Sequence, residues 1–164
     1  MAEARFKAYA AAAAVFGLDR VTKVIIEQRV SESASYRVIP GFFDIVHSEN
    51  RGVAFGIFND SAFEWRSLAL IVVAVVAVIF IGAYMWRAQH IDAATLWGLA
   101  LILGGAAGNV FDRIVFGRVT DFLLVYIGSY QWPAFNVADS AIVIGCGFLL
   151  LDLLHTKRQA IHVP

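Results

Sequence analysis

The stretch from Leu68 to Trp86 reads LALIVVAVVAVIFIGAYMW and contains no charged side chain. An apolar run of about 18 residues or more is long enough to cross the hydrocarbon core of a bilayer as an α-helix. This segment therefore predicts a membrane-spanning helix. It also predicts the solvent, lipid rather than water, in which the rest of the chain has to fold.

The composition of the whole chain agrees with a membrane environment. Of the 164 residues, 60% are hydrophobic and 16% are charged, whereas soluble domains are nearer ~45–50% apolar and ~25% charged. The length permits one domain, which we expect to cover 1–164. The 13 basic and 13 acidic residues give no net charge, so nothing suggests a nucleic-acid partner.

Three further segments are candidate spans. The segment 93–111 is strongly apolar, with Asn109 near its end, whereas 8–26 is interrupted in its second half by charged residues. The segment 137–154 has Asp139 near its start and Asp152 near its end. We expect a mainly α integral membrane protein with four transmembrane helices, at about 8–26, 68–86, 93–111 and 137–154. Basic residues flank both faces almost equally, so the positive-inside rule leaves the orientation open.

The two long connections, about 29–65 and 114–135, lie on the same face of the predicted bundle. Tyr36–Ile39 and Phe42–Val46 read as two short strands around a Pro-Gly turn, and Val119–Ile127 reads as a third strand. Both connections are rich in aromatic residues, which favour the headgroup level of a bilayer. We therefore predict a small β-sheet lying on the membrane at this face.

Two polar clusters occur where predicted helices meet that face. Asn109, Asp112 and Arg113 are spaced at i, i+3 and i+4, so we expect them to share a helical face and Asp112 to pair with Arg113. At the start of the last span, Asn136 is a predicted N-cap, which places Asp139 in the first helical turn. Both clusters put polar groups at the end of an apolar helix.

Asp121, on the predicted strand, and Asp139 have no basic residue at helical spacing. Carboxylates near hydrocarbon are costly, so each needs a partner or a task. If the strand lies over the end of the last span, the two meet in a poorly hydrated place and share one proton. Such a pair can activate water while protonating a substrate carbonyl. The residues alone leave this role open beside a structural or proton-carrying one.

Other chemistries have weaker support. The four histidines, His47, His90, His155 and His162, are dispersed without an H-E-x-x-H motif, so we expect no metal site and no cofactor. Cys146 is the only cysteine, which excludes an internal disulfide, and we expect it to be a packed core residue. Asp19 and Lys23 are spaced at i and i+4, which favours an ion pair over snorkelling of Lys23 to the headgroups.

Taken together, these motifs resemble the bacterial lipoprotein signal peptidases (signal peptidase II) over nearly the whole chain. The matching residues, in chain order, are Leu18-Asp19 with Thr22-Lys23, Asn50-x-Gly52-x-Ala54-Phe55, Gly108-Asn109-x-x-Asp112-Arg113, Val119-x-Asp121-Phe122 and Phe135-Asn136-x-Ala138-Asp139. The chain departs from the family pattern at Arg20, where glutamine is common, and His47 stands at a position that varies.

The resemblance implies that Asp121 and Asp139 are the catalytic dyad of an aspartyl endopeptidase. It also implies a set of substrate-binding or supporting residues, namely Asn50, Gly52, Asn109, Asp112, Arg113, Asn136, Asp19 and Lys23. The implied substrate is a diacylglyceryl-modified prolipoprotein in membrane lipid, cut just before its lipidated cysteine. The implied setting is the bacterial inner membrane, with both termini cytoplasmic and the sheet and dyad at the outer face. Cyclic peptide antibiotics of the globomycin type are implied inhibitors.

Two other functions are compatible with the residues. A small transporter or proton-translocating protein also uses intramembrane carboxylates, although four short spans without an internal repeat suit it poorly. A non-catalytic assembly factor with a membrane-lying sheet is the third possibility. The arrangement of the carboxylates discriminates between these functions. A transporter needs carboxylates that are accessible from both faces of the membrane, whereas a peptidase needs two carboxylates that face each other at one face.

Overall fold

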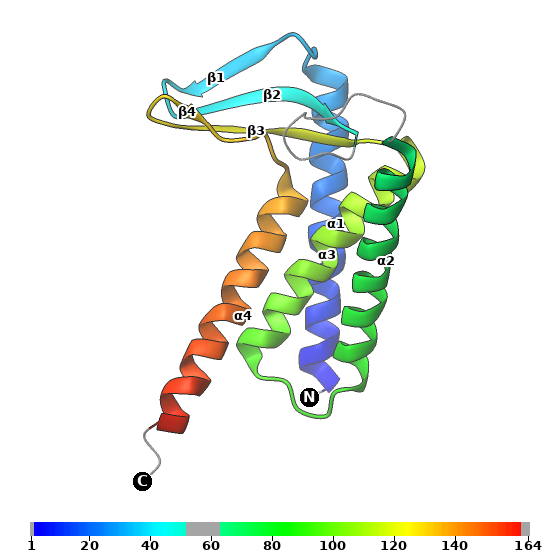
Figure 1. The fold of residues 1–164 in the computed structure, drawn as a ribbon, viewed down its shortest axis with the longest axis vertical. Helices are drawn as coiled ribbons and strands as arrows, with labels where there is room; N and C mark the ends of the chain where they lie inside the picture. Colours follow the sequence, from blue (N-terminus) through cyan, green and yellow to red (C-terminus); the bar gives the residue numbers. More distant parts are fainter. Residues whose placement is uncertain (1, 52–62, 162–164) are drawn as a thin grey trace.

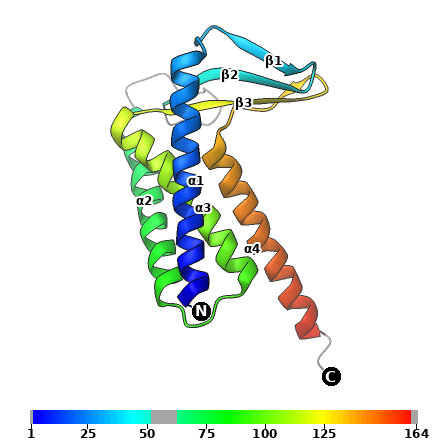
Figure 2. The same ribbon diagram turned by 180° about the vertical axis from the view of Figure 1, so that it is seen from behind.

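The computed structural model describes residues 2–51 and 63–161. Within these ranges four long helices stand side by side, and a sheet lies across one end of them (Figure 1). The helices are α1 Ala2–Arg29, α2 Phe63–Arg87, α3 Ala93–Phe116 and α4 Val137–Ile161. The start of α1 and the end of α4 lie at the end opposite to the sheet, as the view from behind also shows (Figure 2).

Three helices of the described residues are long and apolar enough to cross a membrane, namely Leu68–Arg87, Ala93–Phe116 and Val137–His155. The fourth predicted span is not confirmed, because Asp19, Arg20 and Lys23 interrupt the apolar stretch of α1. Only 6% of the apolar window of α2 is buried inside the protein. Many of its large apolar side chains are exposed, among them Val73, Ile79 and Phe80, as expected of a helix whose solvent is lipid.

The central helix is α3, which packs against α1, α2 and α4. Glycines make these approaches close. A Cβ atom at Gly104 would collide with the backbone oxygen of Ala12 on α1, and one at Gly105 with that of Ala138 on α4. Small residues at such positions let membrane helices come into backbone contact. The prediction for Cys146 was wrong, because its side chain is exposed on α4 rather than packed in the core.

The sheet is antiparallel with the order β1-β2-β3-β4. Its strands are β1 Ser35–Ile39, β2 Phe43–Asn50, β3 Val119–Ile127 and β4 Tyr130–Gln131. The three predicted strands are confirmed, with β2 longer than expected, and the two-residue β4 was not predicted. The pairing of β2 with β3 sets Ser48 opposite Asp121, after an irregularity between Ile45 and Ser48. Bulges of this kind re-aim side chains and are common next to active sites.

The sheet is fixed to the helices at two points. Ile26 and Val30, at the end of α1, form a buried cluster with Phe122 of β3. Phe135, just before α4, bridges back to Leu123 of β3 through a pair of backbone hydrogen bonds of 2.8 and 3.0 Å. This second contact brings the start of α4 beside the polar residues of β3.

Candidate active site

Asp121 lies on β3 with only 4% of its surface exposed. Its Oδ1 accepts a hydrogen bond of 2.7 Å from the side-chain amide of Asn136, and its Oδ2 accepts one of 3.1 Å from that of Asn50. Burial, and next the negative charge of Asp139, raise the pKa of Asp121 to about 6, while the two hydrogen bonds oppose this rise. This carboxyl group therefore keeps its proton up to about pH 6, well above the usual range of an aspartate.

Asp139 lies in the first turn of α4, where it forms a reciprocal cap with Asn136. The Asn136 Oδ1 atom accepts from the Asp139 backbone N–H at 2.9 Å, and Asp139 Oδ2 accepts from the Asn136 N–H at 3.2 Å. The predicted N-cap is thus confirmed, in the capping-box arrangement. Because Asn136 also donates to Asp121, one fully buried side chain connects both aspartates.

The second oxygen of Asp139 is held from α3. Asn109 donates from Nδ2 to Asp139 Oδ1 at 2.7 Å, and its Oδ1 accepts from Nζ of Lys23 at 3.1 Å. A lysine can only donate, so this contact makes Asn109 present its amide hydrogens toward Asp139. Asp139 itself is only partly buried. The site therefore combines one buried and one partly exposed carboxyl group.

Behind these residues is a buried ion network centred on Lys23. The lysine Nζ donates to Asp19 Oδ2 at 2.7 Å and to Asp112 Oδ2 at 2.6 Å, and Lys23 and Asp19 are both completely buried. The predicted i, i+4 ion pair is confirmed, and snorkelling of Lys23 is excluded. Asp19 Oδ1 also accepts from the backbone N–H of Ala138 at 2.9 Å, which ties α1 to the first turn of α4.

The expected pairing of Asp112 with Arg113 was wrong. Asp112 instead pairs with Lys23 and Arg20, both on α1. Consecutive residues of a helix do not face each other, and α1 brings two cations to the side where Asp112 points. Arg113 donates to the backbone oxygen of Asn109 at 3.3 Å. Its buried Nε atom has no hydrogen-bond partner in the described part of the chain.

Comparison with known proteins identifies the family. The model for signal peptidase (SPase) II matches residues 11–155. The chain belongs to the signal peptidase II family. A lipoprotein signal peptidase of Solibacter usitatus (strain Ellin6076) is 63% identical over 99% of each chain. One of Oleidesulfovibrio alaskensis (strain ATCC BAA-1058 / DSM 17464 / G20) is 45% identical over 93% of this chain and 97% of its own.

Two solved structures are similar to this chain as well. A bacterial membrane enzyme solved by the in meso method at 2.3 Å resolution matches with a TM-score of 0.83 and 27% identity, over 96% of this chain and 93% of its own. A second, solved at 1.9 Å, matches with a TM-score of 0.79 and 29% identity, over 90% and 92%. The chain is therefore a membrane-embedded peptidase with three apolar helices and a small antiparallel sheet.

The structure brings most of the predicted site residues together, and it adds one contact that was not predicted. The residues named from the sequence lie in one hydrogen-bonded network with the two aspartates, except Gly52, which lies outside the described residues; the network contains Asn50, Asn109, Asp112, Arg113, Asn136, Asp19 and Lys23. Arg20 was missed as a partner of Asp112, and its guanidinium also lies 5.4 Å from the ring centre of Phe111 and 4.9 Å from that of Phe116. The signal available in the sequence was the position of Arg20 inside a largely apolar helix, where a charged side chain needs a partner.

Proposed function

We propose that this chain is an aspartic endopeptidase in which Asp121 and Asp139 form the catalytic dyad. Its proposed substrates are diacylglyceryl-modified prolipoproteins, from which it removes the signal peptide just before the lipidated cysteine. The observation that carries the proposal is the connection of two carboxyl groups through Asn136, one of them buried with a pKa of about 6. The names of the relatives support the lipoprotein substrate.

In the proposed mechanism the dyad begins with a single proton, held on Asp121 because its environment is the less hydrated one. Ionised Asp139 takes a proton from a water molecule as the water oxygen attacks the scissile carbonyl carbon. Asp121 donates its proton to the carbonyl oxygen, which gives a neutral tetrahedral diol. Transfer of a proton from Asp139 to the amide nitrogen allows the C–N bond to break, and Asp121 recovers a proton from the diol. Each turnover therefore returns the pair to its starting state.

The neighbouring residues have proposed supporting roles. Asn136 orients the carboxylate of Asp121 and Asn109 that of Asp139, and Lys23 orients Asn109 through the Asn109 Oδ1 atom. Asn50 and Arg113 are placed to bind substrate backbone, since Asn50 contacts Asp121 and the Nε of Arg113 is buried without a partner in the described residues. Asp19, Asp112 and Gly52 complete the set proposed to shape the site.

The proposed setting is the bacterial inner membrane, with α1 as a fourth span. Two features support α1 in the bilayer. It runs beside α3, and its interior charges are compensated, since Asp19, Arg20 and Lys23 all take part in ion pairs. We place both termini in the cytoplasm and the dyad at the outer face, under a sheet whose exposed Phe42, Tyr130 and Trp132 side chains suit the headgroup level.

The substrate is proposed to enter laterally from the lipid. Its signal peptide is a helix whose amides are bonded internally, so it has to unwind locally before water can attack the scissile bond. Globomycin-type cyclic peptides are proposed to occupy the same place, since they present a peptide backbone that is already non-helical.

The test is cleavage of a diacylglyceryl-modified prolipoprotein by purified protein in detergent. Wild type should cut before the lipidated cysteine, while Asp121→Asn and Asp139→Asn should fold and lose at least ~10³-fold in rate, as expected for loss of a group that acts in proton transfer. Asp92→Asn, an exposed aspartate at the far end of α3 without a side-chain cap hydrogen bond, is the control that should retain wild-type activity. Near wild-type activity of either dyad variant would remove the proposed mechanism.

A further inference from the structure

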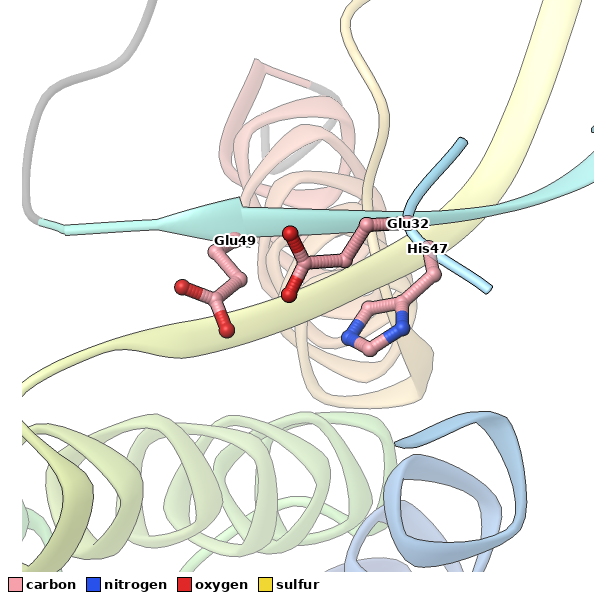
Figure 3. A group of neighbouring side chains, drawn as sticks. All are labelled: Glu32, His47 and Glu49. Carbon is pink, nitrogen blue, oxygen red and sulfur yellow. The ribbon is translucent and has the colours of Figure 1, made fainter. Parts of the chain in front are cut away.

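A second group of ionisable side chains lies on the sheet, away from the paired aspartates. Glu32 lies between α1 and β1, and His47 and Glu49 lie on β2, two positions apart and so on one face of the strand. Figure 3 shows the three side chains together on the same side of β2. A nitrogen of His47 and one oxygen of each glutamate all lie within 4.8 Å of one another.

The imidazole of His47 is already oriented as a ligand. Its Nδ1 atom lies 2.8 Å from the backbone oxygen of Val30. A carbonyl oxygen can only accept, so Nδ1 carries the hydrogen and Nε2 keeps a free lone pair. The Nε2 atom is buried and has no hydrogen-bond partner in the part of the chain that the structure describes. Metal-binding histidines commonly have this arrangement, with the other ring nitrogen donating to a carbonyl.

The carboxylate of Glu49 is held in position by two arginines. Arg118 donates from Nε to Oε1 at 2.9 Å, and Arg51 donates from Nη2 to Oε2 at 3.4 Å. Each carboxylate oxygen has two lone pairs, so both oxygens can accept these bonds and still bind a cation. The arginines therefore fix the carboxylate, as outer-shell partners of metal ligands do. The positive charges of the arginines also offset the negative charges of the two glutamates. The affinity for a cation therefore depends on coordination by the imidazole nitrogen.

We propose that Glu32, His47 and Glu49 form a divalent transition-metal site, with Zn²⁺ as the cation that fits best. One imidazole and two carboxylates are a ligand set that zinc accepts, with a fourth position left for water. Ca²⁺ and Mg²⁺ fit less well because they prefer oxygen ligands only. A bound ion would connect the turn after α1 to β2, where its ligands His47 and Glu49 are at most three residues from Asn50 at the end of the strand. The proposal does not depend on the function of the dyad.

The test uses the full chain, purified without a histidine tag in metal-free detergent, and Zn²⁺ in competition with a chromogenic chelator. Wild type should bind one Zn²⁺ per chain at micromolar concentration. His47→Ala and Glu32→Gln should each weaken binding by about tenfold or more, while His90→Ala, an exposed histidine at the other end of the molecule, should bind as wild type does. Ca²⁺ in tenfold excess should not displace the zinc.

Glu32→Gln keeps the test informative if His47→Ala disturbs the fold, because Glu32 is exposed and lies on a turn. Substitution of Co²⁺ gives a second readout, since its visible spectrum should change between wild type and Glu32→Gln. Zinc binding of wild-type strength in both variants, or none by wild type at micromolar concentration, would overturn the proposal.

Discussion

Replacing Lys23 with methionine should destabilise the fold by about 3–5 kcal/mol, because it breaks a buried ion pair and leaves an uncompensated carboxylate. Lys23 is completely buried and contacts Asp19 and Asp112, and Arg20 is a second cation that pairs with Asp112. Methionine retains most of the volume, so the change in packing is small compared with the loss of charge. The unfolding equilibrium constant should rise by between two and four orders of magnitude.

Equilibrium unfolding in mixed detergent and denaturant measures this loss. The same helix has a matched control, since Lys7 pairs with Glu3 at 2.7 Å and also at i, i+4, but 61% of the Lys7 side chain is exposed. Lys7→Met should change the unfolding free energy by about 0.5 kcal/mol or less, because exposed pairs contribute little.

The double variant Asp19→Asn/Lys23→Met separates charge from packing. It leaves Asp112 paired with Arg20 and no unpaired charge, so it should recover about half or more of the stability lost in Lys23→Met. A loss below about 1 kcal/mol in Lys23→Met, or a double variant no more stable than the single one, would refute the argument that the network is held by charge compensation.

Three further predictions follow from the site. Because the folded pKa of Asp121 is raised to about 6, its protonated form stabilises the fold; this stabilisation is full below about pH 4 and is lost as pH rises through 6. The pH profile of kcat/KM should be bell-shaped, with its falling limb near pH 6. A monotonic rise of kcat/KM with pH would contradict a shared proton. Asn136→Ala should lower kcat at least about 100-fold and stability by about 1 kcal/mol, since it removes both the orientation of Asp121 and the cap of α4, as cleavage and unfolding assays can check. Gly108→Ala should reduce activity because a Cβ atom there would lie 2.7 Å from Asp19 Oδ2, whereas Gly147→Ala, with open space around it, should be tolerated in the same cleavage assay.

Local features were predictable from the sequence because their causes are local. The apolar run of α2, the run of β-branched and aromatic residues in β3 and the N-cap at Asn136 each depend on residues a few positions apart. The ion pair of Asp19 and Lys23 also follows from a helical spacing of four. For these features the periodicity of helix or strand is enough to bring the side chains together.

The other features of the site could not be predicted in this way, because they depend on contacts between segments that are far apart in the sequence. Asp112 was assigned to its neighbour Arg113, although its partners are on α1, because only the packing of α1 on α3 determines which side chains meet. In the same way, the proximity of Glu32 to His47 depends on how the turn after α1 meets β2. Whether α1 is a span was difficult to predict for a related reason, since Asp112 on α3 pairs with two of its cations.

The ion pairs between α1 and α3 also have a consequence for biosynthesis. Ribosomes make α1 before α3, and in the bilayer proposed for it the interior of α1 carries Asp19, Arg20 and Lys23, whose charges sum to one positive charge. The balancing carboxylate, Asp112, follows 89 residues after Lys23. The positive charge of α1 therefore remains uncompensated while α2 is being made and inserted. For an α1 that spans the bilayer as proposed, stable integration has to await α3, so that the order of synthesis differs from the order in which the helices become firmly embedded.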